Sequence, residues 1–404
     1  MSNGVELSIV MPCLNEAETL EACIAKAKRF IEGRSISGEV VIGDNGSTDG
    51  SQDIARRLGA RVVDIPVRGY GAALYGAVMD ANGKYCIMGD SDDSYDFSRL
   101  DPFVAALRSG ADLVMGNRFM GGIAPGAMPW KNRYIGNPIL SGIGRLLFGS
   151  KARDFHCGIR GFSKAAFERM DLHTMGMEFA SEMVIKATLK NMNVVEVPTT
   201  LSPDGRSRPP HLRPYRDGWR HLRFMLLFSP NWLFLYPGIL LLLAGVLLGG
   251  ALFPHPVTIH GVRFGIDTLI YCATMAEVGF QLLLFAVLSR MFADQEGLFP
   301  NSRWTAWLGR WLQLERGTLI GGALVLGGVA MVFRALYIWS STHFGALDAD
   351  SFTRLVVCSS LLISTGMEFV FSSCLFSILQ LNVRVLGKET ARQGFGGAPV
   401  MAHS

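Results

Sequence analysis

The chain has 404 residues and a formal net charge of +4, with 49% hydrophobic and only 18% charged residues. The length predicts two or three structural units, and so apolar a composition indicates segments embedded in a membrane rather than a wholly soluble protein. Seven cysteines without paired spacing such as CxxC argue against a disulfide framework and a zinc site. The first seven residues are short and polar, so we expect no signal peptide.

The first half of the chain alternates strand and helix patterns. Apolar runs predict strands near residues 7–11, 39–42, 61–65, 84–88 and 112–115. Helical patterns lie between them, at 16–33, through 54–58 and through 70–78. This alternation predicts an α/β fold, a mostly parallel sheet with helices on both faces.

Polar clusters follow the first four of these strands, at residues 12–16, 44–49, 68–71 and 90–96. Parallel sheets bind ligands at the carboxyl ends of their strands, where these clusters are expected to meet. The clusters contain neither a Walker loop nor a GxGxxG pattern, so ATPase and dehydrogenase chemistry are not indicated. The pattern predicts a nucleotide site of another kind.

The fourth cluster holds four acids within seven residues: Asp90, Asp92, Asp93 and Asp96. Carboxylates this close repel one another unless a cation lies between them, and their oxygens suit Mg²⁺ or Mn²⁺. The alternative is a solvated acidic loop. Asp90 and Asp92 are the predicted metal ligands. Asp93 and Asp96 are candidates for outer contacts of the metal, and helix capping at Ser98 or plain solvation is the alternative for both.

Five segments resemble, in order, the family 2 glycosyltransferases with a GT-A fold, and more closely the polyprenyl-phosphate glycosyltransferases of the dolichol-phosphate mannose synthase type. The segments are Ser8–Glu16, Asp44–Asp49, Asp90–Asp92, Gly116–Phe119 and Asp154–Phe162. The resemblance covers roughly residues 6–230. It implies a Rossmann-like, mostly parallel GT-A domain that uses a nucleotide sugar.

The resemblance places Pro12, Glu16 and Asp44 around the nucleobase of the donor, and Asp90 and Asp92 at the metal–diphosphate. The full predicted donor site is Pro12, Leu14, Glu16, Asp44, Gly69, Gly71, Asp90 and Ser91, with Asp92 as a catalytic residue. Leu14 stands where many members have Tyr, and Asn45 replaces a second acid. Both departures leave open whether the donor carries mannose, glucose or an N-acetylhexosamine.

An acceptor phosphate would be ionised near neutral pH, because the second pKa of a phosphomonoester is about 6. Such an acceptor needs cations to hold it and no general base. The chain offers Arg118, Arg133, Arg160, Arg206 and Arg208, and arginine forks suit phosphate oxygens. The family's pattern implies that Arg118 and Arg133, catalytic here, grip the phosphate together with Asn137. Surface positions are the alternative, and for Arg160 an ion pair with Asp154.

Other polar residues of this half have weaker cases. Glu178 and Glu182 share a helix face and favour a structural or acceptor-shaping role, although hydroxyl-transferring relatives take a base from this region. His156 and Cys157 form a tempting nucleophile pair. An inverting transfer needs no covalent intermediate, which favours a packed loop histidine.

Residues 206–223 hold six arginines and a single acid, Asp217. A helix is predicted from Pro214, with one stripe of Tyr215, Trp219, Leu222 and Leu226 beside a stripe of Arg216, Arg220 and Arg223. This layout is typical of an interfacial helix on an anionic membrane surface. Nucleic-acid binding is the less favoured alternative, because a membrane span follows directly.

Four apolar runs, at about 231–253, 268–292, 317–340 and 353–381, reach the roughly 20 residues that cross a bilayer. The predicted units are a catalytic domain at 1–208, an interface helix region at 209–229, a membrane domain at 230–383 and a flexible tail at 384–404. The positive-inside rule puts the catalytic domain and the C-terminus in the cytoplasm, on the inner membrane. Glycines 321, 322, 327 and 328 suit close helix packing or homo-oligomers.

Charged residues inside the runs, Glu277, Arg334 and Glu368, are either functional or an interhelical ion pair.

The sequence as a whole predicts a metal-dependent, inverting transferase that moves one sugar onto a polyprenyl phosphate for cell-envelope glycans. Two alternatives stay open. A processive polysaccharide synthase would use a hydroxyl acceptor, but Pro300 and Trp307 stand where its Gln-x-x-Arg-Trp motif needs Gln. A non-enzymatic lipid-handling protein would not need the Asp-x-Asp pair.

Overall fold

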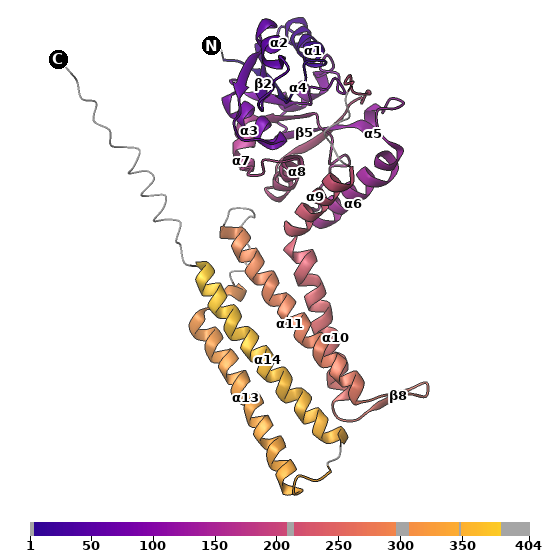
Figure 1. Ribbon diagram of the computed structural model, residues 1–404, viewed down its shortest axis with the longest axis vertical. Helices are drawn as coiled ribbons and strands as arrows, with labels where there is room; N and C mark the ends of the chain where they lie inside the picture. Colours follow the sequence, from indigo (N-terminus) through magenta and orange to yellow (C-terminus); the bar gives the residue numbers. More distant parts are fainter. Residues whose placement is uncertain (1–3, 208–213, 296–306, 347–348, 381–404) are drawn as a thin grey trace, which may run out of the picture. The chain divides into compact units, whose positions relative to one another are not determined.

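A computed structural model of the chain describes residues 4–207, 214–295, 307–346 and 349–380. Contacts between residues divide the chain into two compact units, Met1–Ser229 and Pro230–Ser404. The first unit contains a sheet and its helices, and the second contains long apolar helices (Figure 1).

The sheet of the first unit has seven strands in the order β3-β2-β1-β4-β6-β5-β7. Only β6 runs antiparallel to its neighbours, so the predicted mostly parallel sheet is confirmed. The strands are β1 (Leu7–Cys13), β2 (Gly38–Asp44), β3 (Arg61–Asp64), β4 (Tyr85–Met88), β5 (Leu113–Asn117), β6 (Arg160–Ser163) and β7 (Val194–Pro198). The first five match the predicted strands, whereas β6 and β7 were not predicted.

Helices cover both faces of this sheet (Figure 1). They are α1 (Leu20–Gly33), α2 (Ser51–Arg57), α3 (Tyr70–Asp80), α4 (Asp101–Arg108), α5 (Arg118–Gly121), α6 (Asn137–Phe148), α7 (Lys164–Met170), α8 (Phe179–Leu189) and α9 (Pro214–Leu227), with the π-helical turn η1 (Asn132–Gly136) before α6. The first helix begins at Leu20 rather than Glu16, and it is preceded by a turn in which the Thr19 N–H donates to the Glu16 carbonyl.

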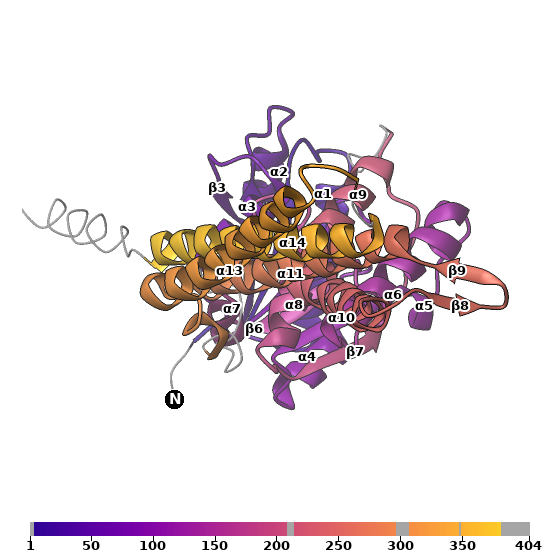
Figure 2. The ribbon, with the colours of Figure 1, turned by 90° about the horizontal axis from the view of Figure 1, so that it is seen from below.

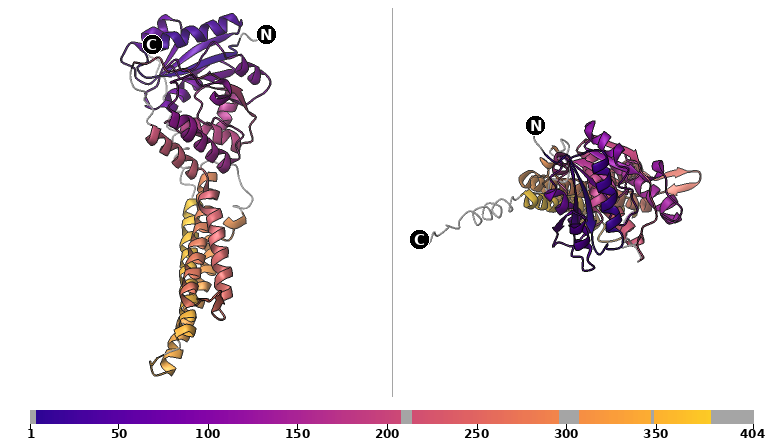
Figure 3. Two further views of the ribbon diagram at one scale, coloured as in Figure 1. Left: turned by 90° about the vertical axis from the view of Figure 1, so that its right-hand side faces the viewer. Right: turned by 90° about the horizontal axis from the view of Figure 1, so that it is seen from above.

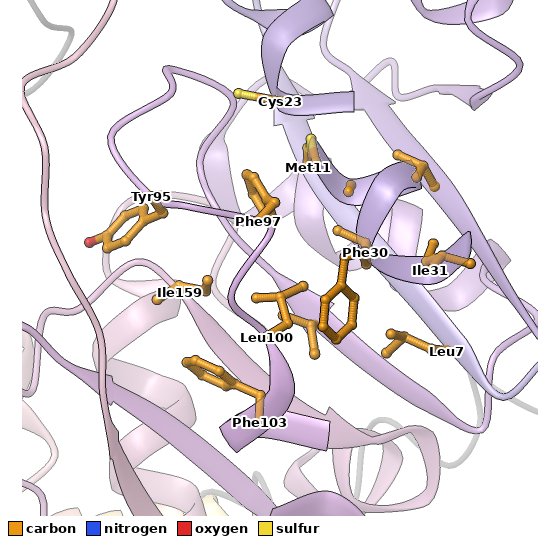
Figure 4. Close-up of a cluster of buried hydrophobic side chains, with 14 of the residues drawn as sticks. Leu7, Met11, Cys23, Phe30, Ile31, Tyr95, Phe97, Leu100, Phe103 and Ile159 are labelled. Atoms are coloured by element: carbon orange, nitrogen blue, oxygen red, sulfur yellow. The ribbon is translucent and has the colours of Figure 1, made fainter. Parts of the chain in front are cut away.

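Alternation along β1 separates two apolar layers, since successive side chains of a strand point to opposite faces. Leu7, Ile9 and Met11 join the layer beneath α1 and α4, where Figure 4 shows Leu7 and Met11 in the same cluster as Phe30, Phe97 and Phe103. Val10 joins the opposite layer, which also contains Met225 of α9. The sheet is therefore packed on both faces, and its open edge for ligands is the carboxyl end of the parallel strands.

Helix α9 docks on the α/β unit through a face that the sequence stripes did not predict. Asp217, His221 and Met225 are buried along that face, whereas Trp219 is 60% exposed. The predicted helix from Pro214 is confirmed. Its apolar and basic stripes flank a third face that belongs to the packed unit.

Among the described residues of the second unit, four helices are long and apolar enough to cross a membrane, as predicted. The first combines the turn η2 (Asn231–Leu235) with α10 (Tyr236–Leu252), and the others are α11 (Ile266–Gln295), α13 (Leu314–Ser341) and α14 (Ala349–Gln380). They run side by side (Figure 3). A short hairpin of β8 (Val257–Ile259) and β9 (Val262–Phe264) joins α10 to α11 (Figure 2).

Small residues let α13 and α14 approach closely. A Cβ at Gly321 would lie 2.6 Å from the Gly366 carbonyl oxygen, and one at Gly328 would lie 2.6 Å from Ile363. Gly322 and Gly327 face no atom within 4 Å among the described residues, so only two of the four predicted glycines serve this contact.

Glu277, Arg334 and Glu368, the charged residues inside the apolar helices, do not form the interhelical ion pair that was one of their two alternatives among the described residues. Arg334 is exposed on α13, and no ion pair in the described part of the second unit joins it to Glu277 or Glu368. Their role stays a prediction.

Candidate functional site

The loop after β4 is fixed to the end of β1 by side-chain hydrogen bonds. The Ser91 hydroxyl donates to the Pro12 carbonyl at 2.6 Å, and the Thr19 hydroxyl donates to the Ser91 carbonyl at 2.6 Å. Asp92 Oδ1 accepts from the backbone N–H and the hydroxyl of Ser94 at 3.1 and 2.6 Å. These bonds fix Asp90 and Asp92 at the carboxyl edge of the sheet.

A cavity of about 720 Å³ lies at this edge, a volume typical of small-molecule sites. It brings together the predicted residues Pro12, Leu14, Glu16, Gly69, Asp90, Ser91, Asp92 and Arg206. Asp44, Gly71, Arg118, Arg133, Asn137 and Arg160 are not among its lining residues. Arg208 lies outside the described residues.

The carboxylate of Asp90 is held in an environment that opposes its charge. Burial and the neighbouring Asp92 carboxylate raise the pKa of Asp90 to about 6, while a hydrogen bond from Tyr70 acts in the opposite direction. A divalent cation between the two acids would relieve this repulsion. Within the described ranges no group of three or more His, Cys, Asp or Glu side chains could hold a metal, so phosphate oxygens of a ligand would have to complete the coordination, as Mg²⁺ sites commonly require.

Arg206 lies between two acids of the cavity. Its guanidinium donates to both oxygens of Glu16 at 2.8 Å and stands 3.5 Å from Asp92 Oδ2. Glu16, which the resemblance places at the nucleobase, is therefore bound to an arginine in this structure. The segment carrying Arg206 is itself fixed, because the Gly205 N–H donates to the Asp92 carbonyl at 2.9 Å.

Asn45 organises the loop after β3. Its amide nitrogen donates to the carbonyls of Ile65 and Val67 at 3.0 and 2.8 Å, and its oxygen accepts from the Gly69 N–H at 2.7 Å. An aspartate could not donate the first two bonds. The departure from the family's acid therefore has a structural reason.

The two glycines of this loop make room for another backbone segment. Gly69 has φ +145°, and a Cβ there would overlap the Met175 carbonyl oxygen. A Cβ at Gly71 would lie 2.6 Å from the Thr174 carbonyl oxygen. Gly71 is buried against this neighbouring loop and is not among the residues that line the cavity, and its contact with the donor stays a prediction.

Asp44 lies at the end of β2, beside the cavity residues Cys13 and Asn45. Its Oδ2 accepts from the Gly46 and Ser47 N–H groups at 3.0 Å. Burial acts to raise the pKa of Asp44, but these hydrogen bonds hold it below the usual range. Its Oδ1 is buried and has no hydrogen-bond partner in the structure.

Arg118, not Arg160, is the partner of Asp154. The Arg118 fork donates to the two Asp154 oxygens at 2.8 and 2.7 Å, and the Asp154 side chain is fully buried. Arg160 is also fully buried and donates to the carbonyls of Phe155, Cys157 and Ala180. The expected Arg160–Asp154 pair is therefore wrong, and in this structure neither arginine is open to an acceptor.

Arg133 and Asn137 lie on the turn η1 and the start of α6. The Arg133 guanidinium stands 5.4 Å from the ring centre of Tyr134, and the Asn137 amide donates to the Met128 sulfur at 3.3 Å. Their predicted grip on an acceptor phosphate stays a prediction.

Glu178, Glu182 and His156, whose predicted functional roles were the weakest, each contact another side chain of the α/β unit. Glu182 is buried, pairs with Lys186 at 3.0 Å, and accepts from the Thr174 N–H and hydroxyl at 2.8 and 2.6 Å. Glu178 pairs with Arg220 at 2.9 Å. The His156 ring packs 4.7 Å from that of His221.

Cys157 beside it is fully buried, which disfavours a role as a nucleophile. Burial raises the pKa of the Cys157 thiol to about 12, and reactive cysteines need a stabilised thiolate. The packed-loop interpretation of this pair agrees with the structure.

Asp93 and Asp96 turn away from the cavity. Asp93 pairs with Lys26 at 2.7 Å, and Asp96 accepts from the Ser98 N–H and hydroxyl at 3.0 and 2.6 Å. Both line a second hollow of about 500 Å³ that contains neither Asp90 nor Asp92. The N-cap of the next helix, α4, is Leu100, so the bonds from Ser98 to Asp96 close a local turn and the predicted helix cap is wrong.

Several cavity residues were missed from the sequence. Tyr70, residues 175–177, and Arg216, Asp217 and Arg220 of α9 all line the cavity. The sequence pattern predicts a membrane surface for the basic stripe of α9, and the structure shows that two arginines of this stripe, Arg216 and Arg220, also line the cavity.

Comparison with known proteins decides the family. The glycosyl transferase family 2 pattern matches residues 8–171, and the pattern of its C-terminal transmembrane region matches residues 287–380. The low-salt glycan biosynthesis hexosyltransferase of Haloferax volcanii is 38% identical over 92% of this chain and 89% of its own length. The chain belongs to glycosyltransferase family 2.

This glycosyltransferase is also similar to a dolichyl-phosphate hexose transferase of Haloferax volcanii, with 31% identity over 48% of this chain and 81% of that protein. A crystal structure of Mycobacterium tuberculosis glucosyl-3-phosphoglycerate synthase with Mn²⁺, UDP-glucose and phosphoglyceric acid covers 55% of this chain and 79% of its own, with a TM-score of 0.44 and 24% identity. The α/β unit has the GT-A fold, and apolar helices follow it.

The contact of Asp90 with Gly158 yields a first prediction for the glycosyltransferase. A Cβ at Gly158 would overlap the Asp90 carboxylate and would lie 3.0 Å from the Tyr95 ring. We expect Gly158→Ala to lower the rate of sugar transfer about 10- to 100-fold if Asp90 is a metal ligand as predicted, because disturbing a group that supports a metal ligand usually has an effect of this size.

Gly33→Ala is the matched control, because a Cβ there meets no atom within 4 Å among the described residues. Initial rates and circular dichroism of both purified variants check the prediction. Equal rates for the two variants would contradict the proposed support of Asp90 by Gly158.

Proposed function

We propose that this glycosyltransferase transfers a single sugar, with inversion, from a nucleoside-diphosphate donor to a polyprenyl phosphate at the cytoplasmic face of the inner membrane. The observation that carries the proposal is the Asp90–Asp92 pair in a 720 Å³ cavity that arginines also line. The names of the relatives, a glycan biosynthesis hexosyltransferase and a dolichyl-phosphate hexose transferase, support the same chemistry.

The nucleobase would lie where β1 and β2 end. Pro12 and Leu14 line this part of the cavity, and Asp44 Oδ1 is a buried acceptor without a partner. Unsatisfied buried acceptors are costly, so a base N–H group that reached this oxygen would remove the cost. Asn45 keeps the neighbouring loop in place through its bonds to Ile65 and Val67.

The diphosphate would lie at Asp90 and Asp92. Both carboxylates would hold Mg²⁺ or Mn²⁺, which as a Lewis acid neutralises charge on the departing diphosphate. Asp92 keeps its orientation through Ser94, and Asp90 through Tyr70. Because the pKa of Asp90 is raised to about 6, this carboxyl group becomes protonated as the pH falls below that value. The proton must leave before a cation binds, so the affinity for the metal should fall below about pH 6.

The acceptor would enter already charged and would need no general base. A phosphate oxygen bonds to the anomeric carbon as the bond from that carbon to the diphosphate breaks, and the electron pair departs on the diphosphate oxygen. Glu178 and Glu182, the candidate bases, are bound to Arg220 and Lys186. Arg133 and Asn137 are proposed to contact the acceptor, and Arg118 to act indirectly, by holding Asp154.

Exposed apolar side chains near these residues suit a lipid acceptor. Trp130, Tyr134 and Ile139 are 62, 67 and 54% exposed, and helix α6, which follows η1, packs beside α9 (Figure 1). Aromatic and aliphatic side chains next to basic residues are typical of a surface that borders a membrane. An isoprenoid chain would find an apolar path there.

The proposal is tested with the full-length protein in nanodiscs, a panel of labelled GDP-mannose, UDP-glucose and UDP-N-acetylhexosamine, and two matched acceptors, a polyprenyl phosphate and the corresponding polyprenol. We expect one donor to give a lipid product with one sugar, only with the phosphate, only with Mg²⁺ or Mn²⁺, and with the opposite anomeric configuration. A polymer would identify a processive synthase. No product with any donor would favour a non-enzymatic role.

A further inference from the structure

The interface helix α9 contributes to the catalytic cavity itself. Arg216, Asp217 and Arg220 line the cavity that holds Asp90 and Asp92. Arg216 and Arg220 are four residues apart, so they lie on one face of the helix. Arg216 and Arg220 therefore border the cavity, and the neighbouring positions Asp217, His221 and Met225 are buried against the α/β unit.

Two of the four cations that line the cavity are paired with carboxylates. Its acids are Glu16, Asp90, Asp92 and Asp217, and its cations are Arg68, Arg206, Arg216 and Arg220. Arg206 is bound to Glu16 and faces Asp92, and Arg220 is bound to Glu178 at 2.9 Å. Arg216 is exposed, and within the described ranges no ion pair engages it.

Arg68 is the other exposed cation of the cavity. It belongs to the loop that Asn45 fixes at the ends of β2 and β3, next to Gly69, which is the side proposed for the nucleotide. Arg216 belongs instead to the helix that precedes the first apolar span. A phosphate carried by a membrane lipid is therefore more easily explained as a ligand of Arg216 than as a ligand of Arg68.

We propose that Arg216 binds the phosphate of the lipid acceptor, so that α9 is an acceptor-binding element in addition to an interface helix. This inference rests on the proposed function, because it requires a phosphate acceptor. It assigns the phosphate to the α9 arginine of the cavity that no ion pair engages among the described residues, whereas Arg118 is occupied by Asp154, Arg220 is bound to Glu178 and Arg133 does not line the cavity. A guanidinium fork can bond two phosphate oxygens at once.

The test compares Arg216→Ala with Arg223→Ala in the full-length protein in nanodiscs. Arg223 is an exposed arginine of the same helix that does not line the cavity. Removing one surface charge leaves the chain held by its four apolar helices, so Arg223→Ala controls for membrane attraction. The readouts are the KM values for polyprenyl phosphate and for the nucleotide sugar, and the slow hydrolysis of the donor by water.

We expect Arg216→Ala to raise the acceptor KM about 10- to 100-fold, the effect of one lost charge-assisted hydrogen-bonding group, with donor KM and donor hydrolysis within about twofold of wild type. Arg216→Lys should give an intermediate acceptor KM, because it keeps the charge and loses the fork. Circular dichroism and the unchanged hydrolysis rate show that the variants are folded.

Three results would overturn the assignment. Equal acceptor KM values for the Arg216 and Arg223 variants would show that Arg216 acts only as a surface charge. A raised donor KM in Arg216→Ala would show that Arg216 binds the nucleotide sugar instead. If the wild-type protein hydrolyses the donor and transfers sugar only to hydroxyl acceptors, the proposed function itself fails, and the phosphate assignment fails with it.

Discussion

Asp92→Asn is expected to reduce sugar transfer by at least about 100-fold, because a metal ion supplies several kcal/mol of charge stabilisation and each 1.36 kcal/mol is tenfold in rate. The substitution removes one of the two carboxylates that are proposed to hold the metal ion. It should preserve the fold, since an asparagine oxygen can still accept the bonds that Ser94 donates to Asp92. The measurements are kcat in nanodiscs and Mn²⁺ binding by electron paramagnetic resonance with the nucleoside diphosphate present.

Asp93→Asn is the matched control at the next position. Asp93 pairs with Lys26 on the side of the second hollow, and its positive φ of 63° suits asparagine. This variant should keep transfer and Mn²⁺ binding within about twofold of wild type. Transfer by Asp92→Asn at the wild-type rate, or equal losses in both variants, would rule out a specific role for Asp92 in holding a metal.

The position of the acidic loop was predictable because few alternatives exist for an apolar run that ends in acids. The run 84–88 has the length and apolar character of a buried parallel strand, and β4 is that strand. Its carboxyl end must then meet the ends of β1 and β2 at one edge. Four apolar runs of membrane-spanning length were equally direct, because length and hydropathy alone decide them.

The partners of the arginines could not be predicted, because charge and spacing do not tell which carboxylate a long side chain reaches. Arg118 and Arg160 are equally plausible partners of Asp154 in the sequence. The structure separates them because Arg160 begins β6, between β4 and β5, and finds backbone carbonyls instead. Strand β6 was missed for a different reason. Its sequence begins with an arginine and a glycine, which are not typical of a central strand.

The interface helix was predicted as a helix but its second role was not. The apolar and basic stripes of α9 predict which residues face solvent or lipid. They do not predict which face of the helix packs on a domain. Asp217 and His221 are polar residues on that buried face, so hydropathy gave no signal for it.

The pair of Arg118 and Asp154 supports the largest expected effect on stability. We expect Arg118→Met to destabilise the α/β unit by about 3–5 kcal/mol, because it leaves the fully buried Asp154 carboxylate without its cation. The double variant Arg118→Met, Asp154→Asn should recover more than half of that loss, since the charge is gone while an amide oxygen can still accept from the residue 118 N–H. Hydrogen exchange of β5 and β6 peptides measures the opening free energy of this unit separately from the apolar helices.

The same experiment decides between two roles for Arg118. If it holds Asp154, the residues between Asp154 and Gly158 loosen in Arg118→Met, and because Gly158 packs against Asp90, donor and acceptor KM values should change together. The double variant should then restore part of both. If Arg118 instead grips the acceptor phosphate, as the family's pattern implies, the opening free energy should stay near wild type while the acceptor KM alone rises. Its bidentate bond to a carboxylate with no exposed surface favours the first outcome, because a guanidinium that left for a ligand would leave that charge buried and unpaired.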